Sequence, residues 1–360
     1  MKKSSLRAAA ALSGAAALLL AGCSSGGGGG TASGGTDDGG DAATARACVI
    51  LPDAASSPRW ENFDREYLQT ALTEAGFEAD IQNAQGDVNK YSTIADQQLT
   101  QGCGVMLLTD YQGAAEAVAA KAKAEGIPVI AYDRPFSGAD YYVSFDNMEV
   151  GRLEGQTVLD GLETAGKDPA TAVVVYMGGD PTDGNAKMFK DGAVEVMEAA
   201  GIKPAAEPPG IWDQAKSQTN FEQALTSLGG KVDGVWVAND TNAAGVIKVL
   251  QDNNLTGVAV SGQDANVAGL QNVLLGWQTA TVYKQVSLEA DAAVEVVTQL
   301  LNGETPTAEN KLDDGTPYIA VTPVLVGPDE VKTVVANGDA AASDVCTGDV
   351  AAKCTEYGVE

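Results

Sequence analysis

Short, continuous runs of Val, Ile and Leu alternate with helix-like segments along most of this 360-residue chain. Runs of this kind are typical of strands that are buried on both faces of a parallel sheet. In the first series the expected helices cover about 59–75, 89–101 and 113–125, and a glycine follows each of them, as is common after a helix. This alternation predicts an α/β fold with right-handed crossovers between parallel strands.

A second series of the same kind begins after Asn147. Its expected helices cover about 148–165, 185–200, 214–228, 243–253 and 267–275, with strands between them, one near 204–211. A strand near 279–284, a long helix over 286–302 and a last strand over 318–326 complete the chain's regular pattern. We therefore expect two doubly wound parallel-sheet lobes with a cleft between them.

The N-terminus has the pattern of an export signal. Three basic residues precede an apolar run over 8–20, which predicts a signal peptide over 1–22 that is too short for a transmembrane helix. The sequence Leu-Ala-Gly before Cys23 resembles the bacterial lipobox, in which the cysteine receives a diacylglycerol. The alternative is an ordinary signal peptide with an incidental cysteine. Residues 23–45 are rich in Gly and Ser and predict a flexible tether, so we expect an extracytoplasmic domain anchored to the cell membrane by a lipid on Cys23.

The formal charge is −27, and the chain contains no histidine. An acidic surface repels phosphates, which argues against a nucleic-acid partner. The absence of histidine excludes the Ser-His-Asp triad, the Cys-His pair and most catalytic zinc sites.

Four cysteines follow Cys23, in a chain whose signal predicts an oxidising compartment. In a sheet with the strand order 2-1-3, Cys48 and Cys103 lie at the amino ends of neighbouring strands, so we expect them to form a disulfide. Cys346 and Cys354 would close a small loop in an acidic C-terminal tail over 339–360. The alternative for these cysteines is that they are free buried thiols.

Five polar clusters each follow an apolar, strand-like run. They contain Asp133-Arg134, Asp146-Asn147, Gly179 through Asn185, Asn239-Asp240 and Gln263-Asp264. Because the carboxyl ends of parallel strands share one edge of a sheet, ligands bind in the crevice at that edge. Paired acceptors and donors there predict recognition of a neutral polyol.

The clusters also resemble those of a known family. The chain is similar to the type I periplasmic sugar-binding proteins of ABC importers, and within them to the D-xylose-binding proteins. The resemblance runs from about residue 47 to 335 and is carried by six segments in order: IPVIAYDRP, YYVSFDNMEVGRLEG, YMGGDPTDGNAKMFKDG, VDGVWVANDTNAAG, VAVSGQDANVAGLQ and TATVYK.

This resemblance implies a Venus-flytrap fold with three hinge crossings. The N-terminal lobe would cover 46–146 plus 283–320, and the C-terminal lobe would cover 147–282 plus 321–338. It also implies a monomer that binds a monosaccharide and delivers it to the transmembrane subunits of an ABC permease. No reaction occurs in that role, so we expect no catalytic residue, no metal and no cofactor.

The resemblance further implies a set of ligand-binding residues. Arg59 and Arg134 would donate to sugar oxygens, Asp133 would orient Arg134 or accept from a hydroxyl, and Trp60 and Trp212 would form opposite walls. The polar rim would be completed by Asp240, Asp264 and Lys284. Three asparagines carry an alternative: Asn147 contacts sugar or fixes the hinge, Asn185 contacts sugar or only caps its helix, and Asn239 contacts sugar or shapes its loop.

Several alternatives stay open. The loop over 52–64 departs from the family pattern, so glucose, galactose or arabinose could replace xylose, and a chemosensory role could be added. A secreted glycoside hydrolase would need two carboxylates at a set separation. A transcriptional regulator with this fold would carry a helix-turn-helix where this chain has a signal and a tether. The segment 180–185 lacks the distal glutamate of a calcium loop.

Overall fold

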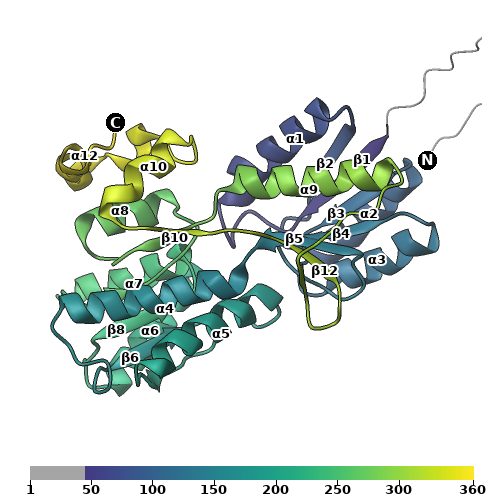
Figure 1. Cartoon of the computed structure of the whole chain (residues 1–360). Coiled ribbons are helices and arrows are strands. Elements are labelled where there is room, and N and C mark those ends of the chain that lie inside the picture. Colours follow the sequence, from purple (N-terminus) through teal and green to yellow (C-terminus); the bar gives the residue numbers. More distant parts are fainter. Residues whose placement is uncertain (1–44) are drawn as a thin grey trace, which may run out of the picture. The chain divides into compact units, whose positions relative to one another are not determined.

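A seven-stranded sheet forms the centre of the first lobe in the computed structural model, which describes residues 45–360 (Figure 1). Along the sheet the order is β11-β12-β5-β4-β3-β1-β2, and every neighbouring pair is parallel except β11–β12. The strands are β1 (Arg46–Leu51), β2 (Glu78–Asn83), β3 (Val105–Leu108), β4 (Val129–Tyr132), β5 (Tyr141–Phe145), β11 (Asn310–Lys311) and β12 (Pro317–Val321).

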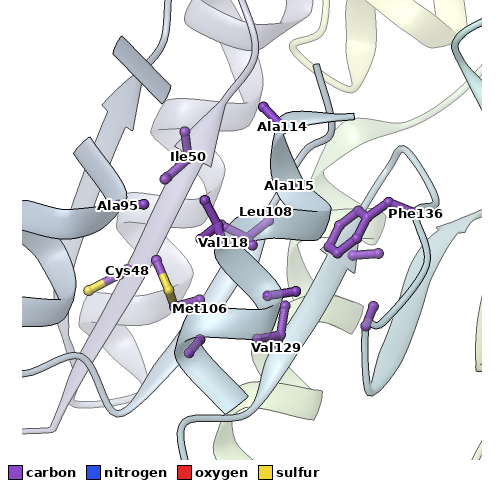
Figure 2. Close-up of a cluster of buried hydrophobic side chains, with 14 of the residues drawn as sticks. Cys48, Ile50, Ala95, Met106, Leu108, Ala114, Ala115, Val118, Val129 and Phe136 are labelled. Carbon is purple, nitrogen blue, oxygen red and sulfur yellow. The ribbon is translucent and has the colours of Figure 1, made fainter. Parts of the chain in front are cut away.

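Helices cover both faces of this sheet. On one face, α2 (Val88–Thr100) and α3 (Ala114–Ala124) bury the apolar cluster of Figure 2, which includes Met106, Leu108 and Val118. On the other face, a wide helical turn over Trp60–Asp64 leads into α1 (Arg65–Glu74), which packs beside α9 (Val286–Leu301). The first lobe is therefore completed by segments from far along the chain.

The second lobe has a four-stranded parallel sheet of the same design. Its order is β7 (Pro204–Ala206), β6 (Val174–Met177), β8 (Gly234–Val237) and β9 (Ala259–Val260). One face is covered by α4 (Asn147–Thr164) and α5 (Gly184–Ala199), and the other by α6 (Gln214–Ser227) and α7 (Asp240–Asp252). The strand expected near 204–211 is thus shorter than predicted.

Two glycines let α4 and α5 pack backbone to backbone. A Cβ atom on Gly151 would lie 2.1 Å from the carbonyl oxygen of Phe189, and one on Gly192 would lie 2.1 Å from that of Met148. No side chain fits at either position without moving a helix, because the obstructing atoms belong to the backbone. The close contact between α4 and α5 fixes the position of the first turn of α5, which carries Asn185 of the third polar cluster.

The chain passes between the lobes three times: after β5, after β10 (Thr281–Tyr283) and after β12. β10 pairs antiparallel with β13 (Val324–Val326). The single last strand expected over 318–326 is therefore wrong: β12 belongs to the first-lobe sheet, and β13 pairs with β10 in a separate two-stranded sheet. Pro323 lies between them, and its missing N–H cannot extend a strand ladder.

The last residues of the chain are folded rather than a tail. A short turn over Pro328–Glu330, α10 (Val331–Ala336), α11 (Ala342–Val345), a turn over Gly348–Val350 and α12 (Ala351–Tyr357) pack on α8 (Val267–Leu275). We call residues 328–360 the C-terminal cap. The acidic composition concealed this packing, since Val345, Val350 and Val359 are buried against α8 between charged residues.

The described residues, 45–360, contain two disulfides. They join Cys48 to Cys103 and Cys346 to Cys354, the two pairings expected from the sequence. The first lies between neighbouring parallel strands, since β1 pairs with β3. Among residues 45–360, no helix combines the length and the hydropathy needed to span a membrane.

Candidate ligand-binding site

A small cavity of about 30 Å³, which we call the chamber, lies between the carboxyl ends of the strands of the two lobes. It gathers nine of the eleven ligand-binding residues expected from the sequence: Arg59, Trp60, Asp133, Arg134, Asn185, Trp212, Asn239, Asp264 and Lys284. Five more residues line it: Ser56, Ser57, Asp183, Phe189 and Gln263. Because the carboxyl ends of parallel strands share one edge of each sheet, side chains that lie far apart in the sequence come together in the chamber.

Asp133 and Arg134 enter the chamber through a sharp turn at the end of β4. Asp133 has a φ of 62°, which places its backbone in the left-handed region. Its N–H donates to the carbonyl of Val143 at 2.9 Å, and the Arg134 N–H donates to the carbonyl of Tyr132 at 2.7 Å. Such a strained conformation is stable only when its surroundings hold it, and it is most common at functional sites.

Arg59 lies at the centre of a buried ion cluster in the first lobe. Its guanidinium forms two hydrogen bonds to Asp64, at 2.7 and 2.8 Å, one to Asp133 at 2.8 Å, and one to Glu289. Asp64 and Glu289 are fully buried. Burial raises the pKa of Glu289 to about 8, although Arg59 opposes the effect. Three carboxylates share one guanidinium, so their negative charge exceeds its positive charge, and this favours the protonated form of Glu289.

Arg134 spans the cleft. Its Nε lies 3.1 Å from Oδ2 of Asp183 in the second lobe, and an NH2 hydrogen is donated to Ser56 at 2.9 Å. The ring of Trp60 contacts two guanidinium groups, with its centre 4.8 Å from that of Arg59 and 5.2 Å from that of Arg134. Trp60 therefore lines the chamber with a face that is already partly covered by cations.

In the second lobe, Asp183 caps α5. Its side chain accepts from the N–H of Asn185 at 2.9 Å, so Asp183 is the N-cap that the sequence interpretation assigned to Asn185. The Asn185 amide is free for another role and donates to the carbonyl of Asp133 across the cleft at 2.8 Å. Asp183 also accepts from the indole N–H of Trp212 at 3.1 Å.

Trp212 is held by close packing on Gly179. A Cβ atom on Gly179 would lie 2.1 Å from the Trp212 ring, so only glycine permits this position. The ring also packs edge-on against Phe189, with centroids 6.5 Å apart. This packing fixes the position of the Trp212 ring in the lining of the chamber.

Asp264 and Lys284 form the third ion pair of the chamber, with Nζ 3.0 Å from Oδ1. Burial tends to raise the pKa of Asp264, but Lys284 and Arg59 outweigh it and lower the pKa overall. Ser57 of the first lobe donates to Asp264 at 3.4 Å. Asn239 lines the chamber and also caps α7 by accepting from Asn242 at 2.8 Å.

The lining of the chamber is polar and balanced in charge. Its three carboxylates are each paired with one of its three cations: Asp133 with Arg59, Asp183 with Arg134, and Asp264 with Lys284. A balanced set of donors and acceptors is suited to a neutral ligand with many hydroxyl groups.

A wider groove of about 590 Å³ adjoins the chamber. The two cavities share Ser56, Arg134, Asp183 and Trp212, so the Arg134–Asp183 pair separates them. The groove therefore forms the approach to the chamber from the side away from the crossings.

Comparisons with known proteins agree with this architecture. Residues 48–305 match the family described as periplasmic binding protein domain. The chain belongs to the periplasmic binding protein family. It is 33% identical to the D-xylose-binding periplasmic protein of Escherichia coli, over 78% of this chain and 86% of that protein. It is 29% identical to the multiple sugar-binding periplasmic receptor ChvE of Rhizobium radiobacter, over 81% and 89%.

A solved structure confirms the type I fold of this periplasmic binding protein. An ABC transporter solute-binding protein from Clostridium phytofermentans, with bound β-D-glucose, superimposes with a TM-score of 0.74 and is 26% identical. The alignment covers 83% of this chain and 99% of that structure. The family and the fold expected from the six sequence segments are thus confirmed.

Two of the expected site residues of this periplasmic binding protein lie behind the chamber wall. Asp240 is fully buried and accepts from Gln278 at 2.7 Å, from Thr281 at 2.9 Å and from the N–H of Asn266 at 3.0 Å. Burial raises its pKa to about 7, despite these bonds. Asp240 supports the loop that carries Asp264 and does not line the chamber.

Asn147 is the other residue behind the wall. Its amide donates to Tyr142 at 2.8 Å and to Asn185 at 3.1 Å, at the start of α4 directly after the first crossing. Of the two alternatives for Asn147, this position favours fixing the hinge. Asn147 contacts the chamber residue Asn185 and does not itself line the chamber.

Sequence reasoning missed Ser56, Ser57, Asp183, Phe189 and Gln263 as lining residues. Asp183 and Gln263 stand within polar clusters at strand ends and could have been found there. The serines lie in the loop before α1, where no periodic pattern constrains the backbone. Phe189 has the helical spacing of an ordinary core residue of α5.

Proposed function

We propose that this protein binds a monosaccharide in the chamber, with D-xylose as the first candidate, and delivers it to the permease of an ABC importer. The support for the proposal is a set of three ion pairs that lines the chamber together with Trp60 and Trp212. Charged donors and acceptors form strong hydrogen bonds to the rim of hydroxyls of a sugar, and flat rings cover its apolar faces. The likeness to the D-xylose-binding protein of E. coli supports xylose.

Contacts that cross the chamber support a closing mechanism. The Arg134–Asp183 pair, the Asn185–Asp133 hydrogen bond and the Ser57–Asp264 hydrogen bond each join one lobe to the other. A sugar that forms hydrogen bonds to chamber residues of both lobes would favour the closed arrangement, because it contacts both lobes only when they lie together. The permease would then recognise the closed surface.

The cellular setting is part of the same proposal. We infer that the domain acts outside the cytoplasm as a monomer, anchored by a lipid on Cys23, which lies outside the described residues. Expression of Cys23→Ser in cells that process lipoproteins tests the anchor. The variant should appear in the soluble fraction, and retention of Cys23→Ser in the membrane fraction would contradict lipid anchoring.

Titration calorimetry tests the sugar. We expect D-xylose to bind at micromolar or lower concentration, with L-arabinose, D-glucose and D-galactose weaker. The Arg134→Ala variant should lose affinity about 100-fold, because charge-assisted hydrogen bonds are removed, while the unfolding temperature stays near the wild-type value. Arg152→Ala is the matched control, since Arg152 lies on the surface of α4 and pairs with Glu195. Failure of all four sugars to bind below millimolar concentration would reject the proposal.

A further inference from the structure

Asp339 is placed by the end of helix α10 in the C-terminal cap. Gly338 has a φ of 86°, its N–H donates to the carbonyl of Val335 at 3.0 Å, and the Asp339 N–H donates to the carbonyl of Val334 at 3.2 Å. This pair of bonds is the Schellman arrangement, which turns the chain sharply after a helix. It directs the buried Asp339 carboxylate toward the crossing strand β10 and helix α1.

Two tyrosines from different lobes donate to the two oxygens of this carboxylate. Tyr67 of α1, in the first lobe, donates to Oδ1 at 2.6 Å. Tyr283 of β10, whose neighbours belong to the second lobe and the cap, donates to Oδ2. Asn337 donates to the Tyr283 hydroxyl at 3.2 Å. The cap is packed on α8 of the second lobe, so the Tyr67 bond joins the lobes.

This connection adjoins the rear of the chamber. Asp339 lines a second small cavity, of about 20 Å³, together with Tyr283 and Phe63. Phe63 stacks on Tyr67 with ring centres 6.3 Å apart. Four residues of the chamber also line this cavity: Ser57, Arg59, Asp264 and Lys284. The cap therefore lies where it can affect how the chamber residues of the two lobes come together.

We propose that Asp339 is a positioning residue that latches the lobes in the closed arrangement through Tyr67. The Tyr67–Asp339 bond joins groups on separate lobes, so it exists only while the lobes lie together. A bond present only in the closed state raises the closed fraction, and the apparent affinity for sugar rises with that fraction. This inference rests on the proposed sugar-binding function, but neither Asp339 nor Tyr67 lines the chamber.

A matched pair of tyrosine variants tests the latch. Tyr67→Phe removes the hydrogen bond to Asp339 that joins the two lobes. Tyr283→Phe removes the other hydrogen bond to the Asp339 carboxylate, whose donor lies on β10 and packs with the cap. Tyr67→Phe should weaken D-xylose binding roughly three- to ten-fold, mainly by faster dissociation, with an unfolding temperature close to the wild-type value. Tyr283→Phe should lower the unfolding temperature and change the affinity less than two-fold. Equal effects of the two variants on affinity, or no effect of Tyr67→Phe, would overturn the proposal.

Scattering from the sugar-free protein gives a test that does not depend on the identity of the ligand. Small-angle X-ray scattering should show a larger radius of gyration for Tyr67→Phe than for the wild type, because the closed fraction falls. An unchanged radius would reject the latch even if no sugar of the panel bound. If the wild type binds sugar while Tyr67→Phe binds equally well, the latch fails and the proposed function stands.

Discussion

Replacement of Glu289 by glutamine should make the protein more stable at pH 8 and change its stability little near pH 5. Glu289 is fully buried on α9, and its Oε1 has no hydrogen-bond partner within the described structure. It shares Arg59 with Asp64 and Asp133, so negative charge exceeds positive charge in this cluster. Glutamine reproduces the shape of the protonated acid without its titration.

The magnitude follows from the pKa of Glu289, which burial raises from 4.5 to about 8 in the folded protein. A raised pKa means that the folded state keeps a proton that the unfolded chain has already released. The contribution to stability is therefore complete below the unfolded pKa and is lost as the pH rises through the folded pKa. A shift of this size corresponds to a loss on the order of 4 kcal/mol between pH 4.5 and 8. Glu289→Gln avoids that loss.

Urea unfolding followed by tryptophan fluorescence at pH 5, 6.5 and 8 measures the effect. The free energy of unfolding of Glu289→Gln should exceed the wild-type value by less than about 1 kcal/mol at pH 5 and by increasing amounts at higher pH. Asp64→Asn is the control, because Asp64 holds Arg59 through two hydrogen bonds and accepts a third from Tyr132 at 2.7 Å. Asp64→Asn should lower the free energy of unfolding by about 3–5 kcal/mol at pH 8. If Glu289→Gln were also destabilised at pH 8, Glu289 would be an ionised partner of Arg59 and the reasoning would be refuted.

Three further predictions concern packing and the disulfides. Gly192→Ala should lower the free energy of unfolding by about 1–3 kcal/mol, because its Cβ would meet the backbone of α4, and an unchanged thermal midpoint would contradict the close contact. Gly179→Ala should displace Trp212 and weaken sugar binding more than ten-fold in calorimetry with little loss of stability, while wild-type affinity would show that Trp212 is not a wall of the site. Replacement of both Cys346 and Cys354 by serine should cost about 2.5 kcal/mol and expose the cap to proteolysis, against about 4 kcal/mol for the Cys48–Cys103 pair, whose sequence separation is 55 rather than 8. Equal protease resistance of the serine variant and the wild type would argue against a role of this disulfide in holding the cap.

Much of the fold and most of the chamber could be predicted from sequence, for a physical reason. Buried parallel strands are continuous apolar runs, and a glycine or an N-cap residue bounds most helices, so the pattern locates them. The helix α8, for example, begins at Val267 and ends at Leu275, as expected. Because strand ends meet at one edge, Asp133, Asn239 and Asp264 could be grouped without knowledge of contacts.

The remainder depends on contacts that local patterns do not contain. Asp64 and Glu289 stand in helices where an acidic residue usually faces water, and only the position of Arg59 explains their burial. Asp240 follows the α7 N-cap Asn239, and its carboxylate accepts from Gln278, Thr281 and the N–H of Asn266 instead of lining the chamber. The cap helices are too short to be stable alone, so their packing on α8 decides their structure.

A crystal structure of the protein with D-xylose would show directly whether the chamber binds the sugar. We expect a single sugar ring in the chamber, between Trp60 and Trp212, with Arg134, Asp264 and Lys284 within hydrogen-bonding distance of its oxygens. The chamber would be larger than its present volume of about 30 Å³, and the contacts of Arg134 and Asp183 would be rearranged around the sugar. Density for the sugar only in the wider groove, or in neither cavity in crystals grown at saturating D-xylose, would contradict sugar binding in the chamber.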